Sequence, residues 1–158
     1  MSTPLRERPY DWIFVGVFGL LTPTTVVFDL LPLLGVGWAR RAIEVGYAPC
    51  DPMFVAMPPF LRVGVVASAV LWWPLYLYFA WGFVKGRNAI RTAALLYAGA
   101  LTMAMTMIFA EALFSAVPGW RTPAPATFIA ANAAYLVLPL ALAWRMRSPF
   151  PFGGDQPG

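Results

Sequence analysis

Three carboxylates, Asp29, Asp51 and Glu111, are the residues of this chain best suited to do chemistry. Asp29 and Glu111 lie in long apolar runs, where an isolated carboxylate costs roughly 2.5–3.5 kcal/mol and normally marks a functional site. Two close carboxylates cannot both ionise easily. A protonated acid beside an ionised one could bind a cationic amine, or deliver and remove a proton. Asp29 and Glu111 are therefore the candidate catalytic residues.

The same acids have a second interpretation, in which they do no chemistry. Each could lie close enough to the membrane surface to be hydrated, or could pair with Arg40, Arg41 or Arg121. We favour a functional role for Asp29. For Glu111, which falls nearer the water boundary, both interpretations stay open.

Other kinds of site are excluded by residue type. The chain has no histidine, and Cys50 is its only cysteine. Ser–His–Asp chemistry, Cys–His chemistry and cysteine zinc sites are therefore unavailable. We expect no metal and no cofactor, so acid–base work falls to carboxylates, tyrosine, lysine or the one cysteine.

The elements that position these acids are membrane helices. The chain is 60% hydrophobic and 11% charged, against about 45–50% apolar and about 25% charged in a soluble domain. Four segments reach the length of roughly 20 mostly apolar residues that crosses a bilayer, namely 12–34, 63–84, 92–117 and 122–144. The sequence therefore predicts an all-α bundle of four transmembrane helices.

Basic residues in the connections predict the orientation. Seven lie on the side of the termini, and four lie on the other side: Arg6, Arg8, Lys85, Arg87, Arg91, Arg145 and Arg147 against Arg40, Arg41, Arg62 and Arg121. Both termini should be cytoplasmic. We expect a cytoplasmic segment at 1–10, a membrane domain at 11–148 and a flexible Gly/Pro-rich tail at 149–158. The membrane would be the endoplasmic reticulum in a eukaryote or the inner membrane in a bacterium. No basic cluster suggests nucleic-acid binding.

The helical rise places the acids together. Asp29 should lie about 26 Å beyond Trp12, and Glu111 about 30 Å beyond Arg91. Both reach the non-cytoplasmic half, where the long loop 35–60 carries Asp51.

Polar and aromatic residues within the spans complete the candidate site. Asn132 is either a contact between helices or a ligand contact. Trp72, Tyr97 and Tyr135 either pack between helices or line an aromatic cavity, where a cation over a ring gains about 0.5–2 kcal/mol. The candidate ligand-binding set is Asp29, Asp51, Trp72, Tyr97, Asn132 and Tyr135.

Several short motifs, in order and spacing, resemble the EXPERA family, which includes the sigma-two receptor and a sterol Δ8–Δ7 isomerase. They are Asp11-Trp12, Pro23 and Asp29-Leu30; Asp51-Pro52 and Pro58-Pro59; Pro74 and Lys85-Gly86; Ile90-Arg91-Thr92 and Tyr97; the run 132–139; and Arg147-Ser148-Pro149. The resemblance implies a pocket for sterols and cationic amphiphiles. It implies that Asp29 pairs with a ligand amine or carbocation, that Asp51 orients Asp29, and that Asn132 and Tyr135 line the pocket.

One departure from the family bears on activity. Ser68 stands where the family has a second acid, and serine cannot supply a proton at neutral pH as a carboxylic acid can. Isomerase activity is therefore open, with Glu111 as a substitute acid, while ligand binding is less affected.

Two functions follow from these observations. The first is a membrane protein whose pocket binds a sterol, another isoprenoid lipid or a cationic amphiphile entering sideways from the bilayer. This function could include isomerisation of a double bond in the ligand. The alternative is a structural accessory subunit, in which aromatic residues around the second helix contact a partner. A homodimer or a larger membrane complex is compatible with either function.

Overall fold

The computed structural model describes residues 3–153 and contains the four expected membrane helices. They are Asp11–Leu33, Pro59–Lys85, Ile90–Phe114 and Pro125–Arg145, and each is long enough to cross a bilayer. A short 3₁₀ turn, η1 (Leu5–Glu7), precedes them. The described residues contain no strand. The prediction of an all-α protein with four membrane-spanning helices is confirmed.

Two of the membrane helices begin at a proline. Pro59 and Pro125 occupy first helical positions, where the missing N–H would have had no helical partner. The fourth helix starts later than residue 122, because Thr122 is held by the preceding connection. Its N–H donates to the Ala112 carbonyl at 2.8 Å, and its hydroxyl donates to the Cys50 carbonyl at 2.5 Å.

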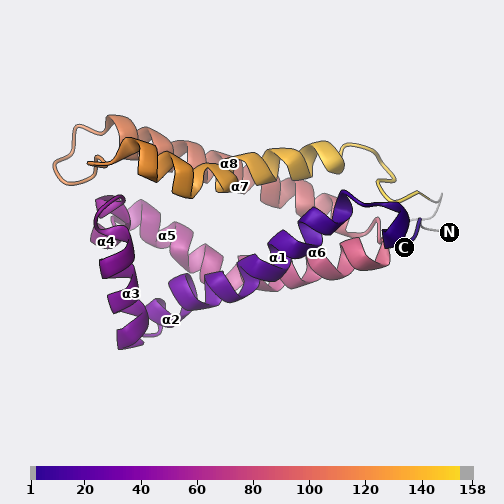
Figure 1. The fold of residues 1–158 in the computed structure, drawn as a ribbon, viewed down its shortest axis with the longest axis horizontal. Helices are drawn as coiled ribbons and strands as arrows, with labels where there is room; N and C mark the ends of the chain where they lie inside the picture. Colours follow the sequence, from indigo (N-terminus) through magenta and orange to yellow (C-terminus); the bar gives the residue numbers. More distant parts are fainter. Residues whose placement is uncertain (1–2, 154–158) are drawn as a thin grey trace.

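The segment 35–60, expected to be a long loop, is largely helical. It forms α3 (Gly37–Tyr47) and α4 (Pro52–Ala56), which cross one end of the bundle (Figure 1). On α3, Ala39 and Ile43 are buried one turn apart, while the arginines between them are exposed. This short amphipathic helix covers the end of the bundle, and the expectation of an irregular loop is corrected.

Two membrane helices contain a π-helical turn. The first runs as α1 (Asp11–Thr25), η2 (Val26–Leu30) and α2 (Leu31–Leu33), and the second as α5 (Pro59–Ala67), η3 (Ser68–Trp72) and α6 (Trp73–Lys85). Pro32 and Pro74 each lie two residues after a π turn. Proline leaves an earlier carbonyl without its helical donor, and prolines and π turns both bend helices. The two turns carry Asp29 and Ser68.

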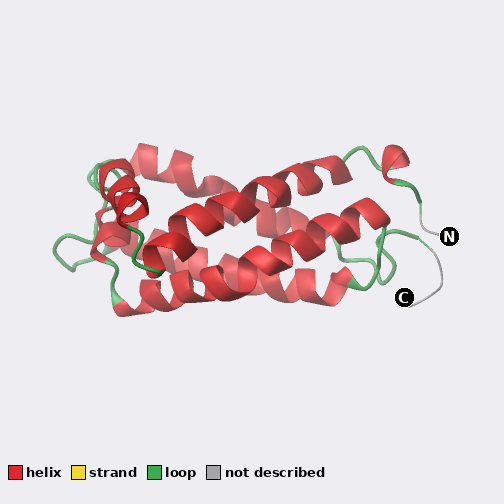
Figure 2. Cartoon of the chain, turned by 90° about the horizontal axis from the view of Figure 1, so that it is seen from below, coloured by secondary structure: helices red, strands yellow, loops and turns green. Residues whose placement is uncertain are grey.

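The helices pack as two pairs. The α1 helix lies along α6, and α7 (Ile90–Phe114) lies along α8 (Pro125–Arg145). In Figure 1 the pairs approach each other near residues 3 and 153 and separate toward α3 and α4. Figure 2 shows loops confined to the two ends of the bundle.

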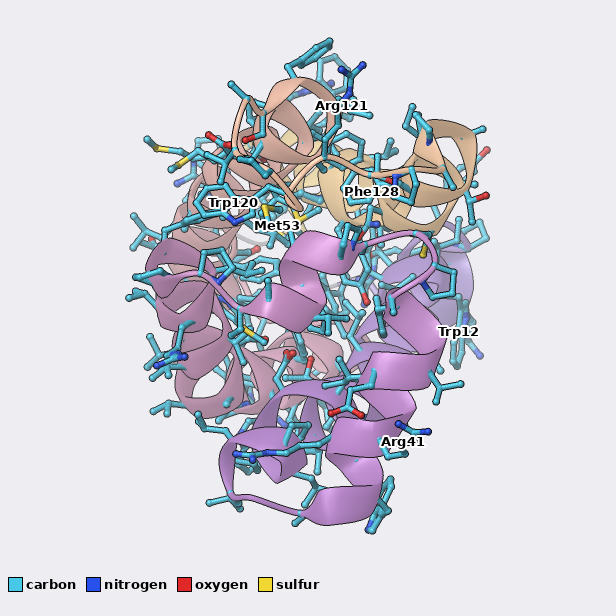
Figure 3. All side chains as sticks on the ribbon, turned by 90° about the vertical axis from the view of Figure 1, so that its left-hand side faces the viewer. Trp12, Arg41, Met53, Trp120, Arg121 and Phe128 are labelled. Carbon is cyan, nitrogen blue, oxygen red and sulfur yellow. The ribbon has the colours of Figure 1, made fainter. Side chains whose placement is uncertain are left out.

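Two clusters of buried side chains hold the pairs together. The larger cluster lies near residues 3 and 153 and includes Phe18, Phe79 and Phe83. The smaller cluster joins the opposite ends of the helices and consists of Met53, Leu61, Ala112 and Phe128. Figure 3 looks onto that end and shows Met53, Trp120 and Phe128 close together.

A buried ionic group closes the end that carries residues 3 and 153. Asp11 is 1% exposed and accepts hydrogen bonds from Arg8 and from Arg145, the latter at 2.7 and 2.9 Å. The guanidinium groups of Arg8 and Arg145 lie 4.8 and 5.0 Å from the centre of the Phe152 ring. We call Arg8, Asp11, Arg145 and Phe152 the end latch.

The end latch involves the segment expected to be a flexible tail. Phe152 is buried, its N–H donates to the Asn88 side chain at 3.1 Å, and its carbonyl accepts from the Thr3 N–H at 3.1 Å. The structure thus packs part of 149–153 onto the bundle. Residues 154–158 lie outside the described part of the chain.

Candidate functional site

A cavity of about 290 Å³ lies between the two buried clusters. Tyr76 of the larger cluster and Leu61 of the smaller one are both among its lining residues. The walls come from α1, η2, α3, α4, α5, η3, α6, α7 and α8. All four membrane helices therefore contribute, together with the two short helices that cross the end.

Asp29 and Ser68 are in direct contact at the wall of this cavity. The Ser68 hydroxyl donates a hydrogen bond of 2.5 Å to Oδ2 of Asp29, and both residues line the cavity. Each sits on a π turn, where the helix is bent and its side chains are re-aimed. Ser68, at the position where the resemblance implies a second acid, thus contacts Asp29 directly.

The arginines proposed as partners of Asp29 are engaged elsewhere. Arg40 donates to the Pro32 carbonyl at 3.2 Å, and Arg41 pairs with Glu44 at 3.2 Å. Arg121 lies at the outer edge of the bundle (Figure 3). Within residues 3–153, no ion pair involves Asp29 or Asp51. The interpretation in which loop arginines neutralise these acids is not supported.

Asp51 reaches the cavity from the start of α4. Its Oδ1 accepts a 3.0 Å hydrogen bond from the Phe54 N–H, which caps the helix, and the side chain is 5% exposed. Burial raises the pKa of Asp51, and the Phe54 hydrogen bond opposes this rise. Asp51 therefore brings a second carboxylate to the cavity without touching a basic side chain.

Three aromatic rings of the lining pack against one another. Tyr47 of α3 packs its ring against Phe28 at 6.0 Å and against Phe54 at 4.8 Å between centroids, and all three line the cavity. Burial is the main cause of a raised pKa of Tyr47, and the charges of Tyr135, Asp29 and Asp51 add to it. Sequence reasoning missed Tyr47, because nothing in the segment 35–60 indicated a helix facing inward.

Most of the candidate ligand-binding residues meet at this cavity. Asp29, Asp51, Trp72, Asn132 and Tyr135 all line it. The amide nitrogen of Asn132 donates to the Phe128 carbonyl of its own helix at 3.0 Å. Their contact with a ligand remains a prediction.

Tyr97 and Glu111 do not belong to the lining. Tyr97 lies behind it, with its hydroxyl donating to the Tyr76 hydroxyl at 3.2 Å and its ring edge-on to Trp72 at 5.2 Å. On α7 the lining ends at Ile108, one helical turn before Glu111. Tyr97 can therefore act only through Trp72 or Tyr76, and Glu111 is not placed beside Asp29.

The chemistry of the lining favours a cation. It contains two carboxylates, several aromatic rings and the amide of Asn132, and no arginine or lysine. A protonated amine would meet a counter-charge at Asp29 and ring faces nearby. The remaining wall is mostly aliphatic and suits an apolar ligand body.

One comparison with known proteins gives a family. The family model described as EXPERA, the expanded EBP superfamily, matches residues 48–146, which is more than half of the chain. The match begins just before Asp51 and takes in the second, third and fourth membrane helices. Comparison with curated proteins gives no match.

Proposed function

Since the chain belongs to the EXPERA family and is an integral membrane protein, we propose that its cavity binds a cationic amphiphile or a sterol-like amine. Asp29 supplies the counter-charge. Trp72 and Tyr135 present ring faces to the ligand, and Asn132 offers a polar contact. The end with residues 3 and 153 faces the cytoplasm, in line with the excess of basic residues there.

The observation that carries this proposal is the setting of Asp29. Its carboxylate is half-buried at a cavity wall, holds one hydrogen bond from Ser68 and has no ion-pair partner among the described residues. An ionised carboxylate in such a place is costly unless a cation approaches it. A ligand amine would remove that cost, which gives the site its preference for cations.

Ligand binding requires fewer chemical groups than double-bond isomerisation does. Moving a double bond requires one group that gives a proton and one that takes a different proton. Asp29 can serve as one of them, but Ser68 cannot serve as the other, and Glu111 is outside the lining. We therefore propose ligand binding without isomerase activity.

The alternative of a structural subunit rests on the aromatic residues of the second helix. Trp72 lines the cavity, Tyr76 and Phe79 are buried, and Trp81 is exposed. Of these rings, the inward-facing ones are accounted for within the chain, and Trp81 lies near the membrane boundary, where tryptophan is common. Purification separates the two functions, because a subunit would bring other chains with it.

The proposal is tested by the binding of a radiolabelled sterol-like amine to the purified protein. Saturable binding is expected for the wild type, with a large loss in Asp29→Asn, which keeps the shape and removes the charge. Glu44→Gln is the matched control, since Glu44 is exposed on α3 and outside the lining. Absence of saturable binding to the wild type, or equal binding by Asp29→Asn, would overturn the proposal.

A further inference from the structure

The cavity reaches the outer surface of the bundle between α5 and α7. Val63 and Gly64 of α5 and Ala100 of α7 line the cavity, and all three are also exposed, Val63 at 70%. A residue that belongs to both surfaces marks an opening. Because α5 and α7 lie within membrane spans, this opening faces lipid.

Two contacts frame the opening. On one side, the ring of Trp72 meets Tyr97 of α7 at 5.2 Å. On the other side, Leu61 belongs to the same buried cluster as Ala112 of α7. Between these contacts the two helices present small side chains to the cavity, Gly64 and Ala67 on α5 and Ala100 and Ala104 on α7. We call this framed stretch the α5–α7 window.

The cavity is too small to enclose a long-chain ligand completely. A volume of about 290 Å³ is at the lower end of the roughly 300–1,000 Å³ of pockets that enclose drug-sized ligands. An amine head with a short apolar body fits such a space. An amphiphile with a long chain does not fit it completely, so part of the molecule must leave the cavity.

We propose that the hydrocarbon tail of the ligand passes through the α5–α7 window into the bilayer while its amine stays at Asp29. The site would then take amphiphiles with one amine head and one long, narrow tail. This inference rests on the proposed amine site. It adds the chemical class of the ligand and places its entry between α5 and α7.

The energetics of a tail in lipid lead to a distinctive expectation. A tail that remains among lipid chains gains little by binding, because it exchanges one apolar environment for a similar one. With the ligand concentration expressed per lipid, affinity should therefore depend weakly on tail length in the wild type. Closing the α5–α7 window should lower the affinity for ligands with long tails and leave the affinity for ligands with short tails unchanged.

Gly64→Trp is the variant that closes the window. A side chain added at Gly64 meets no other atom within 4 Å at its first carbon, so the backbone can accept the change. Ala100→Phe narrows the window from the opposite rim. Gly19→Trp on α1 is the matched control, because Gly19 is exposed, equally unobstructed and outside the lining.

The measurement uses N,N-dimethylhexylamine and N,N-dimethylhexadecylamine as competitors of the radiolabelled amine, with the protein in lipid nanodiscs. In Gly64→Trp and Ala100→Phe we expect the hexadecyl amine to bind about tenfold more weakly, and the hexyl amine to change little. Gly19→Trp should bind both amines as the wild type does.

Three outcomes would overturn the window. They are unchanged hexadecyl binding in both variants, equal loss of both amines, or a wild type that rejects the hexadecyl amine but binds the hexyl one. Failure of the wild type to bind either amine would instead contradict the amine site itself. The failure of the inference and the failure of the proposed function are therefore distinguishable.

Discussion

The hydroxyl of Ser68 donates a hydrogen bond of 2.5 Å to the carboxylate of Asp29, joining the π turns of the first two membrane helices. A serine at this point can only donate to an ionised acid or exchange hydrogen bonds with a protonated one. It fixes the position of the acid without adding charge. Ser68 is in this sense a positioning residue for Asp29.

Ser68→Ala should weaken amine binding. Hydrogen bonds to charged groups contribute about 1.5–3 kcal/mol, so we expect a loss of affinity of about tenfold or more. Ser68→Thr, which keeps the hydroxyl, should bind more like the wild type. Binding of the radiolabelled amine measures both variants, and equal affinities for Ser68→Ala and the wild type would show that the hydrogen bond does not position Asp29 for the ligand.

Ser68→Glu should restore the second acid that the family resemblance implies. Two carboxyl groups facing one cavity would share a proton, which is the arrangement needed to give one proton and take another. We expect the variant, and not the wild type, to move a Δ8 sterol double bond, as measured by gas chromatography of extracted sterols. Turnover by the wild type would show that Ser68 is no obstacle to isomerisation.

Asp51→Asn should stabilise the protein at neutral pH. Burial raises the folded-state pKa of Asp51 above its ordinary value of 3.8, so the unfolded chain loses this proton first as the pH rises. The contribution of Asp51 to stability therefore decreases as the pH rises from its unfolded-state pKa to its folded-state pKa. Asparagine keeps the oxygen that caps α4 and carries no charge.

Thermal unfolding across pH checks this expectation. The advantage of Asp51→Asn should be present at neutral pH and should shrink as the pH falls toward 3.8. A difference in melting temperature that is constant over this range would contradict the ionisation argument.

Asp11→Asn should destabilise the protein strongly. Asp11 lies between Arg8 and Arg145, whose side chains are 8% and 24% exposed. Removing one partner of a buried ion pair costs about 3–5 kcal/mol, because the remaining charges lose their compensation. The free energy of unfolding in mixed micelles measures this loss. Glu7→Gln, at an exposed pair with Arg6, is the control and should have little effect.

Gly82→Ala should also destabilise the protein, through the turn between α6 and α7. A Cβ at Gly82 would collide with the side chain of the buried Ile90, so that side chain or one of the two helices must shift. Overpacking of this kind costs about 1–3 kcal/mol. Gly19→Ala, with open space around its Cβ, should be neutral or slightly stabilising.

A double-mutant cycle identifies the cause. With Ile90→Ala already in place, the Gly82→Ala change should cost much less, because the clashing methyl group is gone. Equal costs of Gly82→Ala in both backgrounds would place the strain elsewhere.

The membrane helices could be predicted because each apolar run is long enough to have one interpretation. The inward position of Asp29 also followed from its cost in lipid. The depth of Glu111 was a weaker guide, since distance along a helix does not say where a cavity ends. On α7 the lining stops at Ile108, one turn short of that acid.

The two short helices and the end latch could not be predicted, for different reasons. The α3 segment has a single buried pair, Ala39 and Ile43, which is too short a pattern to separate from a loop. Phe152 lies in a Gly/Pro-rich stretch whose composition is typical of a flexible tail. Its burial depends on two arginines and an aspartate brought together only by the fold.

The end latch also orders events during synthesis. Asp11 enters the membrane with the first helix, whereas Arg145 is synthesised 134 residues later and Phe152 later still. Until Arg145 has been synthesised, Arg8 is the only arginine of the end latch that can pair with the Asp11 carboxylate. A chain that stops before the fourth helix keeps the acid of the latch and lacks its closing half. The latch can therefore form completely only after the fourth helix and Phe152 have packed beside the first helix.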